Sequence, residues 1–155
     1  MTSLKRTKLR QCTNCLCVIN GVWEWVEECA RAAADEEPAM RGILDDVCLS
    51  RNSLATSISA RLARKLSRRD MPRELIEPLI REALADEESI LSQIAHDLIA
   101  IVDRDPACRT PLEPLLFYKG FHAITTYRIS HWLWKHGRTI MALQFQSLAS
   151  EVFAV

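Results

Sequence analysis

The chain has 155 residues, which suits one domain with its own core, because single domains most often contain about 100–150 residues. Its 20 Lys and Arg balance 20 Asp and Glu, which excludes the strongly basic surface typical of a nucleic-acid-binding domain. No apolar run approaches the roughly 20 residues that span a bilayer, so we expect neither a nucleic-acid nor a membrane partner.

The first 21 residues predict a disordered leader that contains cysteines. Its basic start is followed by polar residues, where a signal peptide would be apolar. Cys12, Cys15 and Cys17 could hold a metal, but no second Cys or His pair follows at zinc-finger spacing, so free thiols are favoured and no metal site is expected. The six cysteines of the chain form no tight framework, which favours a reducing, cytoplasmic location.

From Val22 onward, apolar residues recur every three or four positions, the period of helices with one buried face. A first helix is expected to end before Pro38, and a second follows that proline. Ser53 is a favourable N-cap for a third helix, and Pro72 suits the start of a fourth. The basic end of the third helix predicts a solvated face, made by Arg61, Arg64, Lys65, Arg68 and Arg69.

A fifth helix is predicted to start at the acidic residues 86–88. The charged, proline-rich segment 103–111 has no helical period and predicts a loop or a very short helix. An aromatic helix then runs to Gly137, and a final amphipathic stretch leads into residues 152–155, whose alternation predicts a strand. We therefore predict an all-α, multi-helix bundle-like domain with the start of a β-strand at its C-terminus.

No local motif identifies an active site. The chain contains no His-Glu-x-x-His, no Gly-x-Ser-x-Gly and no glycine-rich phosphate loop. His122 and His131 lie nine positions apart on the aromatic helix, too far from each other to share a metal. We interpret both, and likewise His96 and His136, as buried or half-buried imidazoles, and assign no catalytic residue.

Asp105 and Pro106 form the most informative pair of residues in the segment 103–111. Asp is a favoured N-cap and Pro a favoured first helical residue, so the pair could simply start a short helix. Alternatively, Asp105 is a loop carboxylate that faces a cationic group of a ligand. The two roles can coexist.

Three segments resemble the N-terminal domain of serine acetyltransferases: DRDPA at 103–107, PLLFYKGFHA at 114–123 and YRISHWLW at 127–134. The resemblance runs from about Val22 to Val155. It implies a helical domain over 22–150, followed by a left-handed β-helix of hexapeptide repeats whose first residues would be 151–155.

These enzymes transfer an acetyl group from acetyl-CoA, their co-substrate, to the hydroxyl of L-serine, an early step of cysteine biosynthesis. L-cysteine inhibits them at the serine site. Their β-helices form trimers, and the helical domains pair these into hexamers, so the resemblance implies self-association.

The resemblance places Asp105, with Pro106 beside it, on the aspartate that helps to bind the amino acid. The catalytic Asp and His and the coenzyme-binding repeats of the family would lie after Val155. We therefore expect this chain to bind no cofactor and to transfer no acetyl group alone, and to self-associate through an aromatic face around Trp132 and Trp134. The alternative is a non-catalytic helical assembly or regulatory module.

Overall fold

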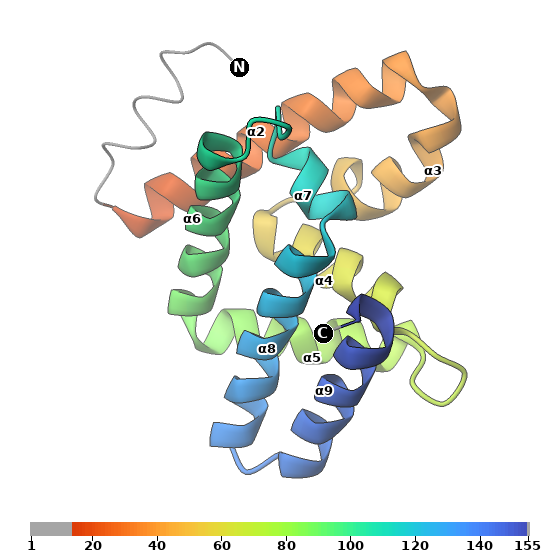
Figure 1. Cartoon of the computed structure of the whole chain (residues 1–155), viewed down its shortest axis with the longest axis vertical. Coiled ribbons are helices and arrows are strands. Elements are labelled where there is room, and N and C mark those ends of the chain that lie inside the picture. Colours follow the sequence, from red (N-terminus) through yellow and green to blue (C-terminus); the bar gives the residue numbers. More distant parts are fainter. Residues whose placement is uncertain (1–13, 155) are drawn as a thin grey trace.

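The computed structural model describes residues 14–154, which form helices joined by loops (Figure 1). The elements are α2 (Cys15–Glu36), the 3-10 turn η1 (Pro38–Met40), α3 (Arg41–Leu44), the π-helical turn η2 (Asp45–Leu49), α4 (Leu54–Leu66), α5 (Arg73–Asp86), α6 (Glu88–Arg104), α7 (Leu112–Phe117), α8 (Lys119–Lys135) and α9 (Thr139–Phe153). The predicted all-α class is confirmed. Within these residues, no helix is both long and apolar enough to cross a membrane.

Helix α2 starts earlier than the sequence predicts. The Asn14 side chain caps it by accepting a hydrogen bond from the Leu16 N–H at 3.0 Å, and Val18 and Ile19 are buried in the core. The disordered leader expected over residues 1–21 is therefore wrong for 15–21, because these residues extend the apolar face of the helix. Residues 1–13, including Cys12, lie outside the described part of the chain.

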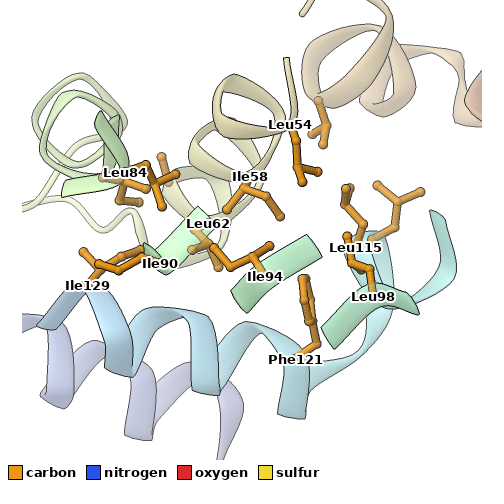
Figure 2. Close-up of a cluster of buried hydrophobic side chains, with 14 of the residues drawn as sticks. Leu54, Ile58, Leu62, Leu84, Ile90, Ile94, Leu98, Leu115, Phe121 and Ile129 are labelled. Carbon is orange, nitrogen blue, oxygen red and sulfur yellow. The ribbon is translucent and has the colours of Figure 1, made fainter. Parts of the chain in front are cut away.

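Helix α4 occupies the centre of the molecule and packs against α2, α5, α7 and α9. Ser53 caps it as predicted, accepting from the Thr56 N–H at 3.3 Å. Leu54, Ile58 and Leu62 are at most 1% exposed, and Figure 2 shows them in one cluster with side chains from α6, α7 and α8. Burial of this apolar surface is the main favourable contribution to folding.

The basic end of α4 is only partly a solvated face. Arg64 is exposed, as predicted, and pairs with Asp46 at 3.1 Å. Arg61, in contrast, is only 5% exposed and donates a hydrogen bond to the Leu116 carbonyl oxygen. The prediction is wrong for Arg61, because α7 covers the side of α4 that carries this residue.

Helices α8 and α9 form a hairpin (Figure 1). Gly137 joins them with a φ of 72°, a left-handed conformation that glycine adopts without steric cost. Helix α9 continues to Phe153, which is 3% exposed and lies 5.6 Å from the His122 ring, centroid to centroid. The strand predicted at 152–155 is therefore wrong for Val152 and Phe153, because the helical apolar face simply continues through them; Val155 lies outside the described residues.

We expect Leu62→Ala to lower the free energy of unfolding by about 2–5 kcal/mol, because it opens a cavity in the core. Leu75→Ala on α5 is the matched control, since Leu75 is 55% exposed and its truncation should cost less than about 1 kcal/mol. Urea denaturation followed by circular dichroism measures both. Equal losses in the two variants would contradict the assignment of α4 to the core.

Candidate functional site

The segment between α6 and α7 holds Asp105 in a tight turn. Asp105 is the C-cap of α6, and its N–H donates to the Ile101 carbonyl at 2.9 Å. Its carboxylate accepts from the Ala107 N–H at 2.9 Å, and its carbonyl accepts from the Cys108 N–H at 3.0 Å. Asp105 therefore ends α6 and stabilises the turn that follows it; the N-cap role considered from the sequence is wrong, because α7 begins only at Leu112.

Cys108 packs the turn that contains Asp105 against helices α2 and α6. It is 6% exposed and forms a small apolar cluster with Trp25 of α2 and Val102 of α6, against which Tyr118 packs. Burial raises the pKa of the Cys108 thiol, and desolvation together with the neighbouring thiol raises the pKa of Tyr118 to about 12. Both groups are neutral at pH 7, and they pack the turn against α2 and α6.

Glu113 holds the other end of the segment. One carboxylate oxygen, Oε1, accepts from the Arg109 N–H at 3.1 Å, the Thr110 N–H at 3.0 Å and the Thr110 hydroxyl at 3.3 Å. Sequence reasoning missed this residue. The spacing Thr110-x-x-Glu113 is the signal that could have found it, because it matches a capping box.

A cavity of about 500 Å³ opens beside Asp105, between α6 and α8. Its walls combine apolar side chains with charged ones: Asp97, Ala100, Ile101, Arg104, Asp105, Tyr118, Gly120, Phe121, Ile124 and Arg128. Pro106, the other predicted substrate-binding residue, is exposed on the adjoining turn and does not line the cavity. The fold thus brings Asp105, but not Pro106, to a space that a small ligand could occupy.

Two carboxylates line this cavity, and their partners differ. Asp97 is paired with Arg128 across α6 and α8 at 2.5 Å. Asp105 forms no ion pair within residues 14–154, although its carboxylate oxygen Oδ1 accepts the Ala107 N–H. Asp105 therefore retains acceptor capacity for a cationic ligand group, because an ionised carboxylate has about four lone-pair sites.

None of the four histidines is arranged as a general base. The Nε2–H of His122 donates to the Leu115 carbonyl at 2.8 Å, and burial lowers the pKa of this imidazole to about 4. His96 bonds the Ser92 carbonyl at 2.8 Å. His136 uses Nδ1 for the Trp132 carbonyl at 2.9 Å and Nε2 for Asp86 at 3.3 Å.

His131 is stacked on Tyr127, with ring centroids 6.0 Å apart, in a groove of about 490 Å³ between α8 and α9. His96 and His131 are exposed, whereas the His136 side chain is half-buried, with 46% of its surface exposed. The expectation of buried or half-buried imidazoles therefore holds for His122 and His136 and is wrong for His96 and His131. Among the described residues, no three His, Cys, Asp or Glu side chains gather as they would around a metal ion.

The geometry describes a helical domain that presents a loop carboxylate at the edge of a cavity. The family model "Serine acetyltransferase, N-terminal" matches residues 22–126. The serine acetyltransferase of Escherichia coli strain K12 is 38% identical over 134 residues, which cover 86% of this chain and 49% of that protein.

Solved structures agree with this match. A serine acetyltransferase of Neisseria gonorrhoeae in complex with serine superposes with a TM-score of 0.85 at 36% identity, covering 86% of this chain and 56% of that one. Serine acetyltransferase structures in complex with cysteine and with CoA each give a TM-score of 0.84 at 36% identity, covering 86% of this chain and 56% and 57% of theirs. This chain belongs to the serine acetyltransferase family, and it spans about half the length of the relatives it matches.

Lowering the pH should destabilise the domain through His122. The folded state resists protonation down to about pH 4, whereas an unfolded imidazole titrates near 6.5. The unfolded state therefore binds more protons between these values, and the free energy of unfolding should fall by about 2–3 kcal/mol as the pH falls through this window.

His122→Gln should reduce this slope, because an amide can still donate to the Leu115 carbonyl but does not titrate. Urea denaturation at several pH values between 7 and 4 measures the effect. His96→Gln is the control, since His96 is exposed. A slope that is the same in His122→Gln and the unchanged protein would contradict the assigned role of His122.

Proposed function

We propose that this chain supplies the amino-acid-binding side of a serine acetyltransferase, and that Asp105 pairs with the ammonium group of L-serine or of the inhibitor L-cysteine. The observation that carries this proposal is the Asp105 carboxylate at the edge of the cavity, without an ion pair within the described residues. A charge-assisted hydrogen bond to an ammonium group is stronger than one between neutral groups. Relatives of similar fold bind serine and cysteine.

Pro106 supports this role indirectly in the proposal. It follows Asp105 directly, and its ring restricts φ to about −65°, which limits the conformations open to the turn. The pair resembles the amino-acid-binding residues of the family, and we retain both as substrate-site residues with different tasks. Asp105 contacts the ligand, and Pro106 stiffens the backbone that carries Asp105.

The reaction to which the site contributes would join the serine hydroxyl oxygen to the acetyl carbon of acetyl-CoA and release CoA. That step needs a base for the hydroxyl proton. In the part of the chain that the structure describes, the imidazoles at 96, 122 and 136 are committed to backbone carbonyls, and that at 131 is stacked on a tyrosine. We therefore assign binding, and not proton transfer, to this chain, and acetyl-CoA to the complete enzyme of the family.

Asp105→Asn should raise the dissociation constant for L-serine and L-cysteine at least tenfold, because the amide cannot pair with an ammonium group. NMR titration of the purified chain measures binding. Asp70→Asn, in the exposed loop between α4 and α5, should leave it unchanged. N-acetyl-L-serine tests the same contact from the ligand side, since it has no ammonium group; binding as tight as that of L-serine would contradict the proposal.

The purified chain should release no CoA from acetyl-CoA and L-serine above background. Turnover that disappears in Asp105→Ala would contradict the division between binding and proton transfer. If the chain releases no CoA and also binds no amino acid, the alternative is favoured, a non-catalytic assembly or regulatory module.

The cytoplasmic location expected from the cysteine pattern remains a proposal.

Self-association is a second proposed function, and it rests on the surface of α8 and α9. Tyr127 and Trp134 line one groove and are 61% and 53% exposed, and Ile140 on α9 is 82% exposed; large exposed apolar side chains are typical of interaction surfaces. Trp132 is not part of this surface, contrary to the expectation from the sequence: it is 3% exposed and donates to the Asp86 carboxylate at 2.8 Å. The face is therefore centred on Trp134.

We expect sedimentation equilibrium to give a mass above that of one chain, and the double variant Tyr127→Ser/Trp134→Gln to weaken the association by about tenfold or more, because aromatic anchors dominate most interfaces. Leu75→Gln on the exposed side of α5 is the control. A monomer at high concentration, or equal association in all variants, would contradict the proposal.

A further inference from the structure

Glu113 stands out because its carboxylate is directed back onto the segment that precedes it. Its Oε1 accepts three hydrogen bonds, two from the N–H groups of Arg109 and Thr110 and one from the Thr110 hydroxyl, at 3.0–3.3 Å. Glu113 forms no ion pair within residues 14–154. These contacts therefore all join the first turn of α7 to the loop that precedes it.

The segment that Glu113 holds is continuous with the turn of Asp105. The Cys108 N–H donates to the Asp105 carbonyl at 3.0 Å, and the buried Cys108 Sγ donates to the Thr110 carbonyl at 3.4 Å. Thr110 is in turn bound by Glu113 through its N–H and its hydroxyl. One chain of contacts thus runs from the Glu113 carboxylate to the backbone of Asp105.

We propose that Glu113 is a positioning residue for the amino-acid site: by binding the loop at 109 and 110, it holds the Asp105 carboxylate toward the cavity. The consequence for the ligand rests on the proposed function of Asp105. Because a single oxygen, Oε1, is the acceptor for three donors of residues 109 and 110, its removal leaves all three without this partner and loosens the loop. A binding group that must be ordered when the ligand arrives binds more weakly than one held in place beforehand.

Three substitutions of Glu113 distinguish the effect of the length of its side chain from the effect of its charge. Glu113→Ala removes the acceptor, and Glu113→Asp keeps the charge but shortens the side chain by one methylene. Glu113→Gln keeps an oxygen at the same reach without the charge. A positioning role predicts that Gln recovers most of the wild-type behaviour and that Asp resembles Ala, whereas an electrostatic effect on the ligand predicts the reverse order.

Two readouts on the full chain decide the matter, and each is independent of the other. The first is amide hydrogen exchange by NMR at Ala107, whose N–H binds the Asp105 carboxylate; we expect exchange about tenfold faster in Glu113→Ala and Glu113→Asp and close to wild type in Glu113→Gln. The second is the dissociation constant for L-serine, which we expect to rise about fivefold to tenfold in the same two variants.

Glu74→Ala is the matched control, a glutamate in the first turn of α5 that leaves both readouts unchanged. Unaltered exchange at Ala107 in Glu113→Ala and Glu113→Asp would overturn the proposal, as would tighter binding in Glu113→Asp than in Glu113→Gln. If the wild-type chain binds no L-serine, the function proposed for Asp105 fails, while exchange at Ala107 still decides whether Glu113 positions the turn.

Discussion

The structure depends on the burial of α4 on nearly all sides. Nine of its 13 residues are buried, so helices from both halves of the chain pack against it. The sequence separation of these partners makes the core non-local: Ile58 and Leu62 meet side chains of α6 to α8 only when the chain has folded back on itself (Figure 2). The position of the loop that contains Asp105 depends on this core. The loop joins α6 to α7, and the packing of the core fixes both helices.

Polar contacts then fix the relative position of the outer elements. Arg61 reaches from α4 to the Leu116 carbonyl at the end of α7. Burial lowers the pKa of Arg61, but a guanidinium starts so high that it remains charged. Asp46 accepts from Arg51, Arg64 and Arg73, and its hydrogen bond with Arg73 is the main reason why the pKa of Asp46 is lowered.

The loop between α6 and α7 is built differently from the rest of the domain. The loop contributes only a small apolar cluster to the core, around Cys108 and Trp25. Its conformation is held mainly by hydrogen bonds between residues close in sequence, such as those of Asp105 and Glu113. Local bonds of this kind can hold a carboxylate at a cavity without burying it. A site that must exchange a ligand with solvent needs that combination of order and access.

The sequence by itself determined the helical class, the Ser53 cap, the end of α8 shortly before Gly137 and the break over 103–111, because period, caps and turn residues act between near neighbours. It also singled out Asp105 through a resemblance. The tertiary structure alone decided the rest. Residues 15–21 and 152–153 are helical, and Arg61 is buried, since each lies against a helix distant in sequence. The cavity beside Asp105 likewise exists only where α6 and α8 meet, and no local pattern encodes which residues of two separate helices will face the same space.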